Sequence, residues 1–120
     1  MTPKPPQGLR ERTKQYALRI IRLYSSLPKT TVAQTIGKQM LRSGTSVGAH
    51  YREAHRGKST PDFISKMEGA LQELDETAYW MELLIEDSIV SSAKLADLRK
   101  ETDELIAIFV ASIKTAKKKL

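Results

Sequence analysis

The sequence predicts an all-α protein, an antiparallel up-down-up-down four-helix bundle. Three observations support this fold class. Apolar residues recur at intervals of three and four in four separate stretches, helix-forming residue types dominate the 120-residue chain, and no run alternates apolar and polar residues as a strand would. The length suits one domain, which we assign to residues 9–120. Because the connections are short, consecutive helices are expected to run antiparallel.

The first helix is predicted from about Gln7 to Leu27, after a tail (residues 1–8) that we expect to be disordered because of its prolines. Pro28 ends this helix, since its ring would clash with the preceding turn. The predicted apolar stripe consists of Ala17, Ile20, Ile21, Tyr24 and Leu27.

The second helix is predicted to begin at a Thr30 or Thr31 cap and to end at Gly57 as a left-handed C′ residue. Its apolar stripe is Ile36, Met40, Ser43, Val47, Tyr51 and Ala54. Three glycines, at positions 37, 44 and 48, interrupt this helix, and each costs about 1 kcal/mol relative to alanine. They therefore predict that another backbone approaches closely on that side.

The third helix has the clearest start, with Ser59 or Thr60 as N-cap, Pro61 in the first turn and Asp62 at the positive helix end. Its stripe runs over about seven turns and ends near Asp87. The fourth helix is predicted from a Ser91 or Ser92 cap to the C-terminal lysines. Its heptad rhythm is carried by Leu95, Leu98, Thr102, Leu105, Phe109, Ser112 and Ala116.

Charge is distributed unevenly along the chain, whose formal net charge is +6. Residues 1–58 hold 12 Lys or Arg against 2 Asp or Glu, whereas residues 59–120 hold 8 against 12. This asymmetry predicts an anionic partner for the first half, or pairing of the two halves. The first candidate is a nucleic-acid-binding surface that would contact phosphates. Its residues are Arg10, Arg12, Lys14, Arg19, Arg22, Lys38 and Arg56, with Tyr16 available to stack on a base.

Two other interpretations of these cations stay open. The basic first helix can be a solvated face that only keeps the protein soluble. Lys38, Arg42, Arg52 and Arg56 can extend the basic surface or instead pair with the carboxylates of the third helix. The chain has no helix-turn-helix, zinc-binding or RNP-like pattern, which argues against sequence-specific reading.

The residue types that carry out catalysis are sparse. There is no cysteine, and His50 and His55 are five residues apart, so they point to different faces of a helix. No Glu-x-x-His pair of a di-iron bundle is present. We therefore predict no catalytic site, no metal and no cofactor. No run reaches the roughly 20 apolar residues of a membrane span. A small helical enzyme that clamps an anionic metabolite with Arg42 and Arg52 is the remaining catalytic alternative.

Two runs carry a family resemblance: residues 39–54, Gln-Met-Leu-Arg-Ser-Gly-Thr-Ser-Val-Gly-Ala-His-Tyr-Arg-Glu-Ala, and residues 62–84, which contain Glu-Leu-Asp-Glu-Thr-Ala-Tyr-Trp-Met. The chain resembles the four helix bundle protein family. Its first-described members are encoded by intervening sequences inside bacterial ribosomal RNA genes. The fold is related to the accessory variability protein of diversity-generating retroelements. Arg42, Ser43, Ser46 and Glu53 match signature positions, whereas His50 replaces a usual Asn and Ala54 a common Gly.

The resemblance implies a non-catalytic protein of the bacterial cytoplasm that forms a homopentameric ring. By analogy with the retroelement relative, it implies binding to RNA or DNA, as an accessory to a nucleic-acid enzyme. We predict that Tyr79 and Trp80 belong to the subunit interface, because three adjacent large side chains at positions 79–81 cannot all face one core. The Gly44-x-x-x-Gly48 spacing allows close helix approach, as packing or as a subunit seam, and we assign both glycines to the interface. The signature residues are predicted to be structural. The alternative function is a protein–protein adaptor whose basic half docks an acidic partner, with no nucleic-acid role.

Overall fold

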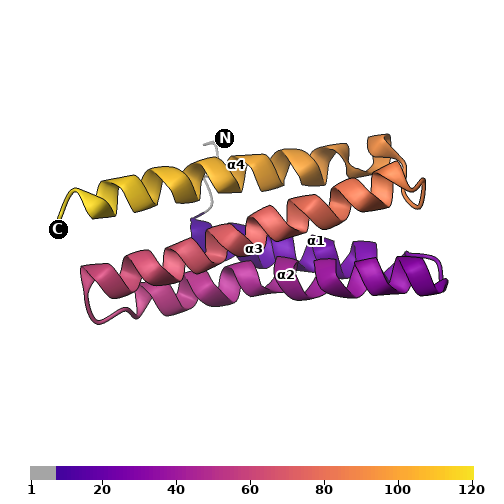
Figure 1. Ribbon diagram of the computed structural model, residues 1–120. Helices are drawn as coiled ribbons and strands as arrows, with labels where there is room; N and C mark the ends of the chain where they lie inside the picture. Colours follow the sequence, from indigo (N-terminus) through magenta and orange to yellow (C-terminus); the bar gives the residue numbers. More distant parts are fainter. Residues whose placement is uncertain (1–7) are drawn as a thin grey trace, which may run out of the picture.

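The chain forms four helices in a computed structural model that describes residues 8–120. They are α1 (Leu9–Ser25), α2 (Thr31–His55), α3 (Thr60–Glu86) and α4 (Ser92–Lys117). Figure 1 shows each helix antiparallel to its chain neighbours, with the α2–α3 connection and the C-terminus at the same end. The predicted all-α bundle is confirmed. The predicted tail falls almost entirely on residues 1–7, which lie outside the described part of the chain.

Side-chain caps begin three of the helices as predicted. Thr30, Ser59 and Ser91 each accept a hydrogen bond from the backbone N–H three residues later. The prediction for Gly57 was wrong, because no described glycine has a positive φ. Gly57 is instead crowded: a Cβ there would lie 2.9 Å from the Ala54 carbonyl oxygen and 3.0 Å from an Asp62 carboxylate oxygen. Small size, not left-handed geometry, is what this position requires.

The apolar face of α1 is rotated from the predicted stripe. Tyr16 and Ile20 are fully buried and Leu23 nearly so, whereas Ile21 is 42% exposed. The reason is that α1 contacts α4 as well as α2, so its buried side extends toward α4. The helix also ends at Ser25, two residues earlier than predicted. Leu27 leaves the helix and packs into the core, where it is 4% exposed.

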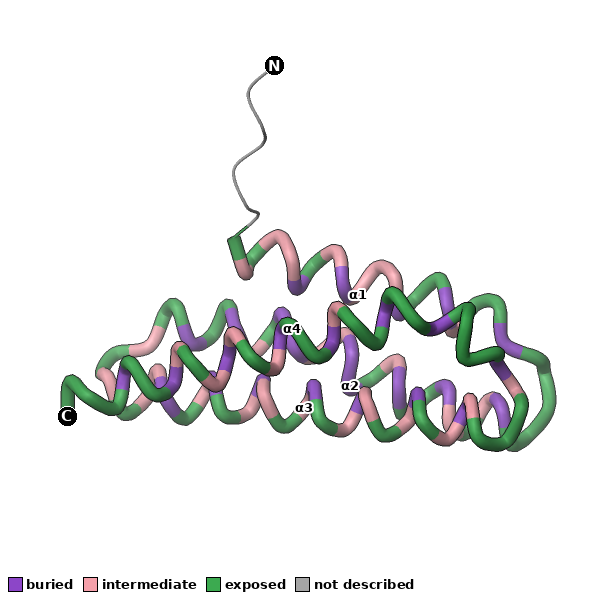
Figure 2. The backbone as a smooth tube through the Cα atoms, turned by 90° about the horizontal axis from the view of Figure 1, so that it is seen from above, coloured by how far each residue is buried: buried purple, intermediate pink, exposed green. Residues whose placement is uncertain are grey.

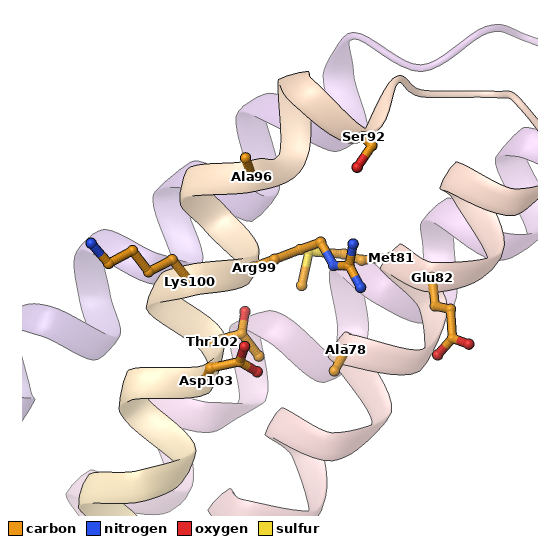
Figure 3. A pocket seen from close by; sticks show the side chains of 9 residues that line it. All are labelled: Ala78, Met81, Glu82, Ser92, Ala96, Arg99, Lys100, Thr102 and Asp103. Carbon is orange, nitrogen blue, oxygen red and sulfur yellow. The ribbon is translucent and has the colours of Figure 1, made fainter.

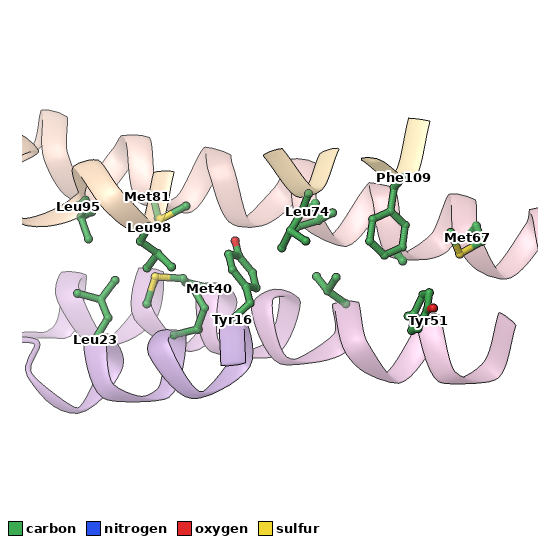
Figure 4. Packing of buried hydrophobic residues seen from close by; sticks show 14 of the residues in the cluster. Tyr16, Leu23, Met40, Tyr51, Met67, Leu74, Met81, Leu95, Leu98 and Phe109 are labelled. Atoms are coloured by element: carbon green, nitrogen blue, oxygen red, sulfur yellow. The ribbon is translucent and has the colours of Figure 1, made fainter. Parts of the chain in front are cut away.

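The core runs along the whole length of the bundle, as the inward-facing buried segments in Figure 2 show. α1 has 17 residues against 25, 27 and 26 in the other helices, so it lines only part of this core. Beyond the start of α1, the other three helices close the core by themselves. Figure 4 shows Phe109 above Tyr51 in the core, with Met67 beside them. The rings of Phe109 and Tyr51 meet edge to face, with centroids 6.0 Å apart.

Buried hydroxyl groups link the helices near the middle of the core. The Tyr16 hydroxyl lies 2.7 Å from Thr102 Oγ1, and Ser43 Oγ lies 2.7 Å from Thr77 Oγ1. Since the Thr102 hydroxyl donates its hydrogen to a carbonyl one turn earlier, Tyr16 donates to Thr102. Burial raises the pKa of Tyr16, which keeps the phenol neutral. These pairs tie α1 to α4 and α2 to α3, so a shifted register would leave buried polar atoms without partners.

The three glycines of α2 face α1 and Leu27, which follows it. The sequence predicted a close approach on that side but not which segment makes it. A Cβ at Gly37 would lie 2.6 Å from Leu27, and one at Gly48 would lie 3.1 Å from Thr13 Oγ1. At Gly44 it would lie 2.8 and 2.9 Å from the two γ-carbons of Ile20. This glycine strip therefore lets α1 and α2 approach closely within one chain.

The substitution Gly44→Ala is expected to destabilise the protein although alanine favours helix. The helix gains about 1 kcal/mol, but the methyl group overpacks the core at a cost of about 1–3 kcal/mol. Ile20 is fully buried and β-branched, so it cannot rotate away. Urea unfolding should show a lower midpoint, and the loss should shrink in an Ile20→Ala background. A Gly44→Ala protein more stable than the native one would contradict this packing.

The turn between α3 and α4 holds Ser88 at a φ of 59°, in the left-handed region that favours glycine. We expect Ser88→Gly to raise the free energy of unfolding by about 1 kcal/mol, because it relieves this strain. Thermal unfolding measures the effect. Asp87→Gly is the control, since Asp87 has a φ of −88° and therefore no left-handed strain that glycine would relieve. Equal shifts in the two variants would refute the assignment of strain to Ser88.

Candidate nucleic-acid interface

The five cations of α1 do not form one surface. Lys14 faces the outer side of the α1–α2 contact, where it lines a groove with α2. Arg10 lies one turn before Lys14 and is exposed on the same side. Arg19 and Arg22 instead line a groove shared with α4. Tyr16 is fully buried in the core, so it cannot stack on a base.

Arg12 is engaged inside the chain. Its guanidinium donates two hydrogen bonds to the carboxylate of Glu101 on α4, one of them from Nε at 3.2 Å. The side chains are only 23% and 18% exposed. The hydrogen bond to Glu101 raises the pKa of Arg12, with partial burial acting in the opposite direction. This pair joins α1 to α4 and leaves Arg12 little capacity to contact a phosphate.

The groove between α1 and α2 has a volume of about 300 Å³. Lys14 and Arg52 are its charged residues, and no carboxylate lines it. Its remaining lining is small, consisting of Thr13, Ala17, Thr45, Gly48 and Ala49. A narrow helix–helix contact, set by the glycine strip, thus leaves room between two cationic side chains.

Lys14 and Arg52 line this groove, and three further exposed cations follow along the same side of the two helices. We call the five residues the basic face: Arg10, Lys14, Lys38, Arg52 and Arg56. Arg56 lies one turn beyond Arg52, and Lys38 lies two turns before Thr45, so the spacing places them along the same side of α2. Within residues 8–120, none of the five forms an ion pair. Their charge is therefore available to an external anion.

Arg52 was not among the seven residues assigned to the site from the sequence, although the sequence allowed it to extend the basic surface. Its spacing did contain the signal, because Gly44, Gly48 and Arg52 follow one another at intervals of four. The glycines face α1, so the arginine must emerge at the edge of the α1–α2 contact. The pairing of Arg52 with α3 that the sequence left open does not occur in the described residues.

The groove between α1 and α4 has a different character. Its volume is about 370 Å³, and Leu23, Leu95 and Leu98 form much of its lining. Arg19 and Arg22 border it on α1, and Lys94 and Asp97 border it on α4. This groove combines leucine surface with a mixed charge border.

The signature residues make contacts within the chain. Arg42 pairs with Glu76 at 3.0 Å and with Glu73 at 3.6 Å, which joins α2 to α3. The Ser46 hydroxyl donates to the Arg42 carbonyl, and Ser43 is buried against Thr77. Arg42 faces the carboxylates of α3, whereas Arg52 lines the groove with α1, so these two residues do not come together as the metabolite clamp envisaged from the sequence.

Glu53, the fourth signature residue, belongs to a second cluster on α2 and α3. Its carboxylate lies 3.9 Å from His50 Nδ1 and 3.8 Å from Lys66 Nζ. His50 packs over Gly69 of α3, where a Cβ would lie 3.2 Å from the same Nδ1 atom. The imidazole therefore occupies space that only a glycine leaves free.

The predicted interface residues do not lie together. Gly44 and Gly48 are buried against α1 of the same chain, so they do not form a subunit seam. Tyr79 is 52% exposed and stacks edge to face with Trp80 on the outer side of α3. We call the surface over α2 and α3 the α2/α3 outer face. Its apolar residues are Val32, Ile36, Tyr79, Trp80 and Leu83.

Some polar atoms near the α2–α3 contact are buried without a hydrogen bond. Among the described residues, three buried side-chain atoms lack a hydrogen bond: His50 Nδ1, Glu73 Oε2 and Trp80 Nε1. All three belong to residues along the α2–α3 contact. A buried indole N–H without an acceptor is unfavourable.

A cavity of about 370 Å³ lies between α3 and the first half of α4. In Figure 3, Arg99 extends across it toward Met81, while Lys100 points away. Glu82 and Asp103 also border the cavity. Across residues 8–120, no three His, Asp or Glu side chains are grouped so that they could hold a metal ion. Nor does any of the four described helices combine the length and apolar character needed to cross a bilayer.

Comparisons with known proteins agree with this architecture. Residues 9–111 match the family described as 23S rRNA-intervening sequence protein. A crystal structure of a protein with unknown function from the S23 ribosomal protein family of Bacteroides thetaiotaomicron VPI-5482 is 36% identical. The match covers 89% of this chain and 99% of that one, with a TM-score of 0.84. No curated protein matches the chain. The family match spans most of the bundle, and the chain belongs to the 23S rRNA-intervening sequence protein family.

Proposed function

We propose that this protein binds nucleic acid through the basic face and assembles with copies of itself through the α2/α3 outer face. The observation that carries the first part is the group of five exposed cations without ion pairs, two of which line a groove free of carboxylates. A phosphate backbone would gain five contacts and release the counterions that it holds.

The groove favours recognition of the backbone over recognition of bases. Lys14 and Arg52 can bind phosphates, and the small lining side chains let a sugar-phosphate strand approach the helices. No aromatic residue lines the groove, so stacking does not contribute. The family description refers to 23S rRNA, which makes structured RNA the first ligand to test.

The test is fluorescence anisotropy with labelled structured RNA, single-stranded DNA and duplex DNA at physiological salt. We expect saturable binding to at least one of them. The matched control is Lys94→Glu with Lys100→Glu. It lowers the net charge as much as two charge reversals on the basic face would, but both residues lie outside that face. If the control weakens binding as much as any change on the basic face does, binding reflects net charge alone and the proposal fails.

Self-assembly is supported by the α2/α3 outer face. Tyr79 and Val32 are each 52% exposed, and Val32, Ile36 and Leu83 border a hollow of about 520 Å³. Contact with a second copy would cover this apolar surface. Assembly as a pentamer stays a prediction. Any closed ring would repeat the basic face around its axis and strengthen binding through multivalency.

Light scattering after size-exclusion chromatography tests this second part. The native protein should have a mass that is a multiple of the 13.5 kDa chain. Tyr79→Asp with Leu83→Asp should reduce it to the monomer, whereas Ile21→Asp, at an exposed apolar residue of α1, should not. A native monomer at micromolar concentration, or an assembly that withstands the paired change, would contradict the proposed interface.

A further inference from the structure

We propose that the groove between α1 and α4 docks an acidic amphipathic helix of a partner protein. This is a second binding surface, separate from the basic face, and its occupant would pack as a fifth helix alongside the bundle. It would connect the nucleic-acid-binding protein to another protein. The following observations concern the shape of the groove, its lining and its charge.

The groove exists because α1 and α4 are the least tightly packed pair of neighbouring helices. Their described polar contacts are the Arg12–Glu101 pair and the Tyr16–Thr102 hydrogen bond. Beyond these contacts, toward the end of α1, the space of about 370 Å³ remains. That volume is at the lower end of the range for pockets that enclose a ligand group.

Leucines form the base of the groove. Leu23 comes from α1, and Leu95 and Leu98 come from α4. They belong to the bundle core and are 2–7% exposed, so an entering apolar side chain would extend the core rather than form a separate one. A helix with apolar residues at i, i+3, i+4 and i+7 would place such side chains along the groove.

The border of the groove selects for negative charge. Arg19 and Arg22 stand three residues apart on one side of α1, and Lys94 faces them from α4. None of these three cations forms an ion pair within residues 8–120. Glutamate or aspartate residues flanking the apolar stripe of a partner helix would meet all three. Charge complementarity of this kind directs orientation and speeds association.

A protein fits this groove better than a nucleic acid does. Asp97 borders the groove, so a continuous phosphate backbone lying along it would meet a carboxylate. A helix can place a neutral or basic residue opposite Asp97, whereas a phosphate chain cannot. The leucine base also favours apolar side chains over sugars and phosphates. The basic face, in contrast, has no carboxylate in its groove.

The experiment uses a synthetic helical peptide with leucine at the i, i+3, i+4, i+7 positions and glutamate elsewhere. Isothermal titration calorimetry measures its binding to the full-length protein. One control peptide has the same composition in scrambled order, and another replaces each glutamate with lysine. The variants are Arg19→Glu with Arg22→Glu for the α1/α4 groove and Lys14→Glu with Arg52→Glu for the basic face. Both change the charge equally, and circular dichroism verifies that both fold.

We expect the amphipathic acidic peptide alone to bind. Arg19→Glu with Arg22→Glu should weaken it roughly tenfold or more, while Lys14→Glu with Arg52→Glu should leave it within about twofold. Equal binding of the scrambled peptide, equal losses in both variants, or no binding at millimolar peptide would overturn the proposal. Loss of RNA binding in the Arg19/Arg22 variant, without peptide binding to the native protein, would instead assign the groove to nucleic acid. The nucleic-acid proposal stands or fails separately, on the Lys14/Arg52 variant.

Discussion

The paired substitution Lys14→Glu and Arg52→Glu should lower affinity for RNA by roughly 10- to 100-fold at physiological salt. Both residues border the α1/α2 groove from opposite helices, so their reversal replaces two attractive phosphate contacts by two repulsive ones. Both side chains are exposed and lack ion pairs within the described residues, so stability should change by less than about 0.5 kcal/mol.

Fluorescence anisotropy measures this effect beside two comparisons. The Arg19→Glu and Arg22→Glu variant carries the same change in net charge but alters the other groove. Its affinity for RNA should fall only by the small contribution that net charge makes to binding. Thermal unfolding shows whether either variant is destabilised. Equal loss in the two variants would mean that the basic face has no special role.

The substitution Phe109→Ala should lower the free energy of unfolding by about 3–5 kcal/mol. Phe109 is fully buried in the bundle core, where Figure 4 shows it next to Tyr51 and Met67. Removal of its ring would leave a cavity between the helices that carry these residues. Its edge-to-face contact with Tyr51 would be lost as well.

Urea unfolding of the variant provides the measurement, with Val110→Ala as the control. Val110 is the next residue of the same helix and is only half-buried, so its loss should be clearly smaller. A Phe109→Ala protein that loses less than about 1 kcal/mol would show that this end of the bundle is not packed as described.

The fold was predictable because helix signals are local. Ser59 and Ser91 cap their helices with the three-residue spacing that the sequence displays. The glycines of α2 indicated a close approach, and the structure identifies α1 as the approaching helix. The left-handed geometry predicted for Gly57 was wrong, because a glycine after a helix can be required for its small size instead.

The candidate site was less predictable because it depends on how α1 is oriented between two neighbours. A rotation of the expected stripe put Tyr16 and Leu23 inside and left Ile21 outside. The cations of α1 were consequently divided between two grooves. The sequence could not indicate that Arg12 would meet Glu101, since 89 residues separate them. Helical periodicity specifies relative directions within one helix but not which helix lies in each direction.

The salt dependence of RNA binding tests the central claim most directly. It is measured for the native protein and for Lys14→Gln with Arg52→Gln, which removes charge without reversing it. If the five cations of the basic face each neutralise one phosphate of a single strand, the logarithm of the association constant should fall with the logarithm of salt concentration with a slope of about 3 to 4. The variant should lower that slope by about 1 to 2. An unchanged slope in the variant would contradict the assignment of phosphate binding to the groove between α1 and α2.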